Sequence, residues 1–203
     1  VSVTAFRDYL RCPFRFYLKH VLRMETVDPF KTELDALDFG TLCHAALEAM
    51  GLEPTLRDAV DPAALREFLR ATIDQRARAR YGAEWPLPLI VQVESARQRL
   101  ARAAEVQAEQ RAAGWVIEHV ERKFELAIGA ITVSGKIDRI ERGPGGAVRV
   151  IDYKTSDKGI TPVAAHVRGV RREETAPAWA RFSIGGREYV WTDLQLPLYL
   201  EAL

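Results

Sequence analysis

The sequence predicts an α/β fold in which a helical region comes first, a small antiparallel sheet follows and a last helix closes the chain. Two observations lead to this class. Apolar residues recur at helical spacing over most of residues 1–113. From residue 114 the pattern changes to short runs rich in Val, Ile and aromatics, separated by glycine-containing turns. We therefore expect one domain over 1–203, mainly helical over 1–113 and built on a sheet core over 114–203.

Four helices are expected before the sheet. They cover, in order, residues 3–20, 40–50, 61–80 and about 89–113. Pro13 should interrupt the first helix, because a proline inside a helix removes a backbone donor. The pair Asp61-Pro62 is typical of a helix start, with the aspartate as cap and the proline in the first turn. Gly114 is a typical C-terminal stop for the fourth helix.

Three strands are expected to follow as a meander. They cover residues 115–128, 130–141 and 147–155. A short helix within 161–170, a hairpin over 181–191 that turns at Gly185-Gly186, and a last helix capped by Thr192 or Asp193 complete the order. The fold class therefore depends chiefly on the change from helical to strand periodicity near Gly114.

The most informative residues lie on the hairpin written GKIDRI…VRVIDYKT. If its turn centres near Gly145, Asp138 lies directly opposite Asp152, with Cβ atoms about 5 Å apart. Lys154 then shares their face, because side chains alternate along a strand, and Tyr153 points the other way into apolar packing. A one-residue bulge would change this register.

Two carboxylates this close repel each other and favour a cation between them. Carboxylate oxygens are hard ligands that suit Mg²⁺ or Mn²⁺. Lys154 could then position or deprotonate a water, or stabilise charge in the transition state of phosphodiester hydrolysis. The alternative is a surface salt bridge between Asp152 and Lys154. The apolar surroundings favour a functional site, since burying three charges without one is costly.

These segments resemble the core of the PD-(D/E)xK nuclease superfamily. IDRI supplies the first acidic residue, Asp138, and IDYKT supplies the D/E-x-K element. Three further segments resemble the RecB-like exonuclease family: LRCPFRFYLKHVL its N-terminal helix, FGTLCHAALE its G-x-x-x-H helix, and DLQLPLYLEAL its Q-x-x-x-Y helix. The resemblance spans nearly the whole chain. It implies a restriction-endonuclease-like core, in which helices and an N-terminal helical region flank a mixed, centrally antiparallel sheet.

The resemblance also implies roles for single residues. His44, Asp138 and Asp152 would bind the metal together with the main-chain carbonyl of Tyr153, and Lys154 would be the catalytic lysine. A histidine on an Ala/Leu-rich helix is more often a packed core residue. The G-x-x-x-H pattern is what favours His44 as a ligand.

Three more positions follow from the resemblance. Gln195 and Tyr199, one helical turn apart, would contact the DNA backbone or orient Lys154. Both could instead simply pack the last helix on the sheet. Glu121, in VERKFEL, would support the metal ligands from the first strand.

The function implied is a Mg²⁺-dependent deoxyribonuclease, most simply an exonuclease of DNA repair or recombination that acts on DNA with helicase domains or subunits. One alternative is a non-catalytic DNA-binding or scaffold domain on the same fold. Another is an unrelated α/β interaction module with a fortuitous D-x-K, which predicts that His44 lies far from Asp138 and Asp152.

Composition limits the remaining classes. The net charge is +1, and arginines crowd the segments 66–80, 97–111 and 168–187, which fits solvated helix faces or nucleic-acid contacts. No apolar run could span a bilayer, and the Val start suggests a fragment of a longer protein. With cysteines only at Cys12 and Cys43, a cytoplasmic protein is expected.

Cys12 lies where some RecB-like relatives carry the first cysteine of an iron–sulfur cluster. This chain alone lacks the later cysteines of such a cluster, so we expect one only in a longer parent protein.

Overall fold

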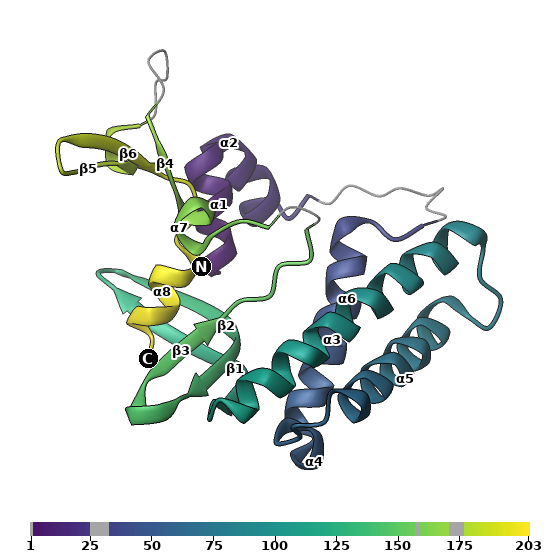
Figure 1. The fold of residues 1–203 in the computed structure, drawn as a ribbon. Coiled ribbons are helices and arrows are strands. Elements are labelled where there is room, and N and C mark those ends of the chain that lie inside the picture. The colour runs from purple at the N-terminus through teal and green to yellow at the C-terminus, as the bar shows by residue number, and fades with distance from the viewer. Residues whose placement is uncertain (1, 25–32, 157–158, 171–176) are drawn as a thin grey trace. The chain divides into compact units, whose positions relative to one another are not determined.

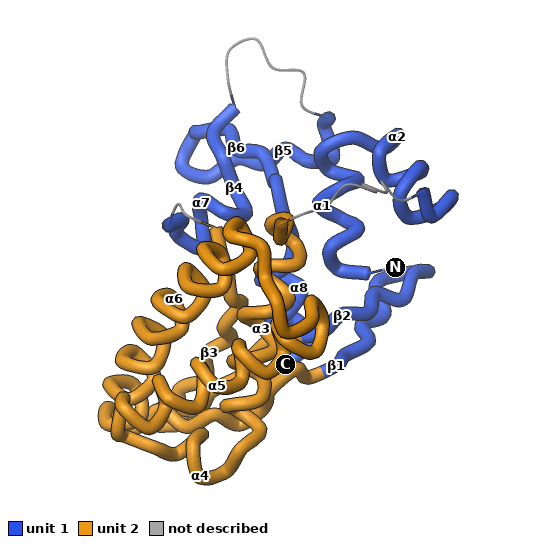
Figure 2. Tube along the Cα trace, turned by 90° about the vertical axis from the view of Figure 1, so that its right-hand side faces the viewer, with its two compact units in different colours: residues 1–27, 123–136, 158–203 blue, residues 28–122, 137–157 orange. Residues whose placement is uncertain are grey.

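The computed structural model describes residues 2–24, 33–156, 159–170 and 177–203 (Figure 1). It has the predicted α/β class, with helices, an antiparallel meander and a last helix in the expected order. The chain separates into two compact units, which Figure 2 colours blue and orange and which are described one at a time. Unit 1 comprises Val1–Val27, Lys123–Lys136 and Lys158–Leu203, and unit 2 comprises Asp28–Arg122 and Ile137–Asp157. The single domain expected over 1–203 stays a prediction.

Unit 2 contains the predicted long helices. They are α3 (Ala36–Leu52), the short α4 (Pro54–Arg57), α5 (Pro62–Tyr81) and α6 (Leu87–Ala112). The predicted end signals of α5 and α6 are confirmed. The Asp61 side chain accepts a hydrogen bond of 2.9 Å from the Ala63 amide, and α6 stops before Gly114, whose φ of +89° favours glycine. Helix α3 begins earlier than expected because Asp35 caps it, accepting a hydrogen bond from the Asp38 amide.

The core of unit 2 lies between these helices. It is formed by aliphatic side chains of α3, α5 and α6, among them Met50, Leu65, Leu69, Ile73, Val93 and Leu100. The arginines of the first two crowded segments mostly face acidic neighbours, as in the ion pairs of Arg97 with Asp74 and of Arg80 with Asp38, both 2.6 Å. These ion pairs support the interpretation as solvated helix faces, and contact with nucleic acid stays a prediction. Arg171 and Arg172 of the third segment lie outside the described residues.

The predicted meander is present as a three-stranded sheet of order β1-β2-β3. Its strands are β1 (Val116–Ile128), β2 (Ile131–Arg142) and β3 (Val148–Ile151). A 3₁₀ turn over Pro144–Gly146 joins β2 to β3, and Gly145 adopts a φ of +69° there. The predicted turn at Gly145 is thereby confirmed.

Unit 1 begins with the aromatic-rich segment. It forms α1 (Val3–Arg11), α2 (Pro13–Phe16) and a π-helical turn, η1 (Tyr17–Val21), so the predicted break at Pro13 is confirmed. Asp8 of α1 is buried and is held by Lys19 at 2.9 Å and by His20 at 2.8 Å. These contacts tie the π-helical turn back onto α1.

The C-terminal part of unit 1 adds a second sheet. Its elements are α7 (Pro162–His166), β4 (Val167–Gly169), the 3₁₀ turn η3 (Ala178–Ala180), β5 (Arg181–Ile184), β6 (Arg187–Trp191) and α8 (Gln195–Glu201). The strands pair in the order β4-β6-β5, and the predicted hairpin turn at Gly185-Gly186 is confirmed. The helix expected within 161–170 is shorter, because its second half pairs with β6 as strand β4.

Among the described residues, no helix has the length and apolar character needed to cross a membrane.

Candidate metal centre

The β2–β3 hairpin has the register that the sequence predicts. Arg139 faces Ile151, and Ile140 faces Val150. Asp138 and Asp152 are the next residues outward in this register. No bulge interrupts the ladder between Arg139 and Arg142, so odd-numbered residues share one face and even-numbered residues the other.

Tyr153 connects the hairpin to helix α3 through its main chain. Its amide donates a 2.8 Å hydrogen bond to Asp138 Oδ2, and its carbonyl oxygen lies 3.1 Å from His44 Nε2. His44 Nδ1 is 3.5 Å from the same Asp138 oxygen. The unrelated-module hypothesis, which placed His44 far from Asp138, is therefore wrong.

Glu121 of β1 joins this group more directly than the sequence indicated. One ligand atom each from His44, Glu121 and Asp138 lies within 4.8 Å of the others. Glu121 has a φ of +52°, a left-handed conformation that is uncommon for a residue with a side chain. Val120 and Glu121 are both half-buried, so the inward–outward alternation of β1 breaks at this position. Strained backbone within a strand is often found at functional sites.

The donor set fits a hard divalent cation. Two carboxylates and a main-chain carbonyl supply the oxygen ligands that Mg²⁺ and Mn²⁺ prefer, and one imidazole lies beside them. Neighbouring ligands of an octahedral ion of this size are about 3 Å apart. The 3.1 Å between His44 Nε2 and the Tyr153 oxygen matches that spacing. The residues present therefore fit such an ion.

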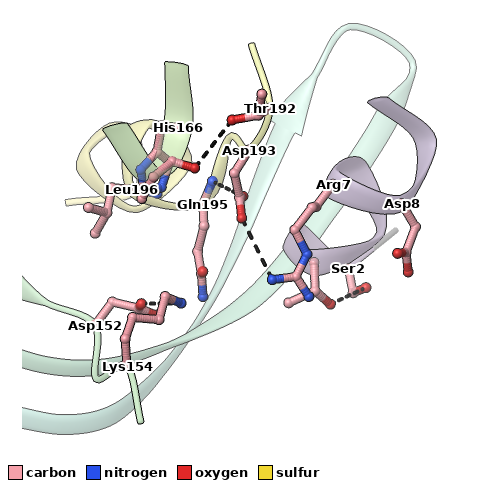
Figure 3. A network of polar contacts seen from close by, with 12 residues as sticks. Ser2, Arg7, Asp8, Asp152, Lys154, His166, Thr192, Asp193, Gln195 and Leu196 are labelled. Atoms are coloured by element: carbon pink, nitrogen blue, oxygen red, sulfur yellow. Dashed lines mark hydrogen bonds and ion pairs between the residues drawn. The ribbon is translucent and has the colours of Figure 1, made fainter. Parts of the chain in front are cut away.

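Asp152 and Lys154 form an ion pair beside this group (Figure 3). Only 6% of the Asp152 side chain is exposed, against 45% of the Lys154 side chain. Burial raises the pKa of Asp152, and its salt bridge to Lys154 opposes the rise only in part. The pKa of His44 is raised by its hydrogen bond to Asp138, against the effect of burial. The His44 shift reflects the negative charge of Asp138, which a bound cation would offset.

Helix α3 approaches the hairpin closely at Gly40, the first residue of the G-x-x-x-H pattern. A Cβ at Gly40 would lie 3.2 Å from Thr155 Oγ1, so the Thr155 side chain would have to shift slightly to admit a larger residue. Arg99 of α6 donates a hydrogen bond to the Thr155 carbonyl, and its guanidinium lies 5.0 Å from the centre of the Phe39 ring. These contacts hold the segment after Lys154 against α3 and α6. Arg99 lies far from the motifs in sequence, and no local pattern indicated its role.

Gln195 and Tyr199 contact each other on one face of α8, as the sequence predicts. Gln195 Nε2 donates a 2.8 Å hydrogen bond to the Tyr199 hydroxyl, which donates one of 2.8 Å to the Lys136 carbonyl. Asp193 accepts from the Gln195 amide and faces Arg7 at 3.9 Å (Figure 3). Both side chains of the pair are buried within unit 1. Their predicted contact with DNA or with Lys154 stays a prediction.

Two other histidines have structural partners. His20 binds Asp8, and His166 lies 2.7 Å from the Pro162 carbonyl and accepts from the Leu196 amide. Cys12 is exposed, and Cys43 is buried next to His44. Burial raises the pKa of Cys43 to about 11, so its thiol is not a ready metal ligand at neutral pH.

Comparison with known proteins gives the same assignment as the geometry. The family model of the PD-(D/E)XK nuclease superfamily matches residues 1–203. The chain belongs to this superfamily. Membership of the superfamily, which the sequence predicted from Asp138, Asp152 and Lys154, is thereby confirmed. The α/β fold is the restriction-endonuclease-like fold of the superfamily.

Curated relatives of this PD-(D/E)XK chain agree with the RecB-like branch. They are the B-type subunits of the ATP-dependent helicase/deoxyribonuclease of Streptococcus agalactiae, from strains of serotypes Ia, V and III. Each is 26% identical over 164 residues, which cover 77% of this chain and 14% of the relative. The chain thus spans about one seventh of the length of the relatives it matches.

Proposed function

We propose that this chain is a Mg²⁺-dependent deoxyribonuclease that hydrolyses phosphodiester bonds of DNA, acting as an exonuclease. The observation that supports this most is the convergence of His44, Glu121 and Asp138 beside the ion pair of Asp152 and Lys154. Superfamily membership and the name of the curated relatives, helicase/deoxyribonuclease subunits, point in the same direction.

The residues that would hold the ion are His44, Asp138, Asp152 and the Tyr153 carbonyl, with Glu121 as a further carboxylate in reach. A bound Mg²⁺ or Mn²⁺ would make water more acidic and offset negative charge on a phosphate oxygen. His44 must be neutral to bind a metal, although Asp138 favours its protonated form.

Lys154 is the candidate for proton transfer and charge stabilisation. Its amine is fixed by Asp152, while nearly half of its side chain stays exposed to an incoming phosphate. An ammonium in this place can hold an attacking water by a hydrogen bond and stabilise the oxyanion that develops on phosphorus. Gln195 and Tyr199 would contact the DNA backbone or orient Lys154.

The wider setting belongs to the same proposal. DNA as substrate and helicase domains or subunits as partners are supported by the relatives' names, and DNA repair is the process that we propose for such an enzyme. A cytoplasmic location suits a chain whose two cysteines are free thiols. Cys12 as one ligand of an iron–sulfur cluster would require a longer parent chain.

The test is cleavage of end-labelled single-stranded DNA in Mg²⁺, in Mn²⁺ and in excess chelator. Wild-type protein should cleave only with metal. His44→Ala and Lys154→Ala should abolish cleavage. The matched changes His119→Ala and Lys123→Ala, at exposed positions of β1, should not. An exonuclease should degrade linear DNA and spare closed circles.

The alternative, a non-catalytic DNA-binding or scaffold domain, predicts a different outcome. DNA would then bind equally well with and without metal, and no cleavage would appear in either Mg²⁺ or Mn²⁺. That result with folded wild-type protein would contradict the proposal.

A further inference from the structure

A buried charge network lies within unit 2, on the face of the hairpin that carries Tyr153. Glu141 has no exposed surface and forms ion pairs with two arginines. Its Oε1 faces Arg139, and its Oε2 faces Arg149. A carboxylate without partners would be very costly to bury at this position, so at least one guanidinium is needed for folding.

The two arginines differ in what else they contact. Arg149 lies flat against Trp115, 3.9 Å from its ring centre, and donates a 2.7 Å hydrogen bond to Gln110. Arg139 donates to the buried Gln107 and, through Nη1, to the Tyr153 hydroxyl at 3.2 Å. Arg139 is thus the arginine that links Glu141 to Tyr153.

Tyr153 in turn touches the candidate metal centre at three points. Its amide binds Asp138, its carbonyl oxygen lies next to His44 Nε2, and its ring meets the His44 imidazole edge-on at 5.7 Å. A rotation of this residue would therefore move the carbonyl and the amide together. The phenol anchored on Arg139 opposes such a rotation.

The space around the Tyr153 ring makes that anchor important. An open pocket of about 240 Å³ borders the ring, and its lining includes the apolar Leu47 and Met50 and the polar Gln107 and Arg149. The ring therefore packs against the core on one side and borders open space on another. The hydrogen bond from Arg139 supplies a directional constraint that apolar packing lacks.

We propose that Arg139 is a positioning residue of the candidate metal centre. Its hydrogen bond to the Tyr153 hydroxyl holds the Tyr153 main chain where the carbonyl can bind the ion and the amide can orient Asp138. Glu141 and Gln107 keep the Arg139 guanidinium in place for this task. This inference rests on the proposed metal-dependent function.

The test measures Mn²⁺ affinity, by electron paramagnetic resonance of the free ion during titration. Tyr153→Phe removes one buried oxygen, and Arg139→Lys keeps the charge beside Glu141 but loses the planar fork. Each should weaken Mn²⁺ binding by about tenfold, the lower end of what partners of metal ligands contribute. Arg149→Lys replaces the other arginine that is paired with Glu141. This variant should leave Mn²⁺ affinity unchanged, even if it lowers thermal stability.

The double variant completes the cycle. If both residues act through one hydrogen bond, combining Tyr153→Phe with Arg139→Lys should again weaken binding about tenfold rather than a hundredfold. Equal Mn²⁺ affinity of wild type and Tyr153→Phe would overturn the inference alone. Equal weakening by Arg149→Lys would also overturn it, because the network would then act only through stability. Wild-type protein that binds no Mn²⁺ would overturn the proposed function and this inference together.

Discussion

Two aspartates in this molecule have similarly small exposed side-chain fractions and are each paired with a lysine, yet their pKa values move in opposite directions. The side chain of Asp8 in unit 1 is 5% exposed and that of Asp152 in unit 2 is 6% exposed. Burial alone would raise both pKa values. Hydrogen bonds from His20 and Lys19 outweigh burial at Asp8 and lower its pKa to about 2. At Asp152, burial prevails over Lys154 and the pKa rises.

The difference lies in how much of the protein surrounds each carboxyl group, since Asp152 lies deeper than Asp8, and in the neighbouring charges. Asp8 faces the basic side chains of Arg15 and Lys19 and the ring of His20. Asp152 has Lys154, but the nearby Asp138 carboxylate works against it. An aspartate whose negative charge is balanced by basic partners stabilises the fold. An aspartate whose charge is only partly balanced marks a place where a further cation would be stabilising.

The largest effect expected from this contrast is on catalysis. Asp152→Asn should reduce DNA cleavage at least about a hundredfold. It should leave the apo protein as stable as wild type or slightly more so, because it removes a buried carboxylate whose ionised form is disfavoured. Asp8→Asn should instead lower the stability of the protein and leave DNA cleavage unchanged. Cleavage rates in Mg²⁺ and melting temperatures measured without metal test both variants. Loss of cleavage by Asp8→Asn with intact folding would contradict the contrast between the two aspartates.

A bound ion should stabilise unit 2. At a Mg²⁺ concentration a hundred times the Kd, the free energy of unfolding should rise by about 2.7 kcal/mol. Asp138→Asn should largely remove this rise, since it takes one carboxylate from the group of three. Thermal melts with Mg²⁺ and with chelator measure it. Identical shifts in both proteins would place the ion elsewhere.

The stabilisation that Asp8 gains from its contacts with Lys19 and His20 should depend on pH in a defined direction. Its folded pKa of about 2 lies below the ordinary value of 3.8, so its stabilisation is complete above about pH 4 and is lost as pH falls towards 2. Asp8→Asn should therefore lower the free energy of unfolding by about 1–2 kcal/mol at pH 7, a range reduced because Lys19 is half-exposed. Denaturant titrations at pH 7 and pH 2.5 should show the difference shrinking; a constant difference would contradict it.

The smallest effect should come from Lys19, the half-exposed lysine that is paired with Asp8. Lys19→Met should cost at most about 1 kcal/mol at pH 7, because the ammonium is half-exposed and His20 still binds Asp8. Denaturant unfolding compares it with Asp8→Asn. A cost as large as that of Asp8→Asn would mean that Lys19 alone holds the carboxylate.

The sequence was sufficient where local signals determine structure. Turn glycines and strand alternation determined the register that aligns Asp138 with Asp152, and a cap followed by proline placed the start of α5. His44 was reached only through a family pattern, because nothing local distinguishes a ligand histidine from a packed one. It nevertheless lies 3.5 Å from Asp138.

Other features depend on packing between distant segments. The left-handed backbone at Glu121 brings its carboxylate to His44 and Asp138, and strand periodicity gives no sign of it beyond an interrupted alternation. The contact of Arg139 with Tyr153 follows from the hairpin register, but the burial of Glu141 depends on α6 covering that face. Such contacts join residues far apart in the chain, where single-sequence patterns carry little information.

The two cysteines give the molecule a built-in pair of chemical labels. Cys12 is exposed, so a thiol reagent should modify it at once. Cys43 is 2% exposed with a pKa of about 11, and it should react only when α3 detaches locally. Because Cys43 precedes His44, the rate at which Cys43 is labelled would report how often the candidate metal centre opens to solvent. The same rate would show how far an added cation slows that opening.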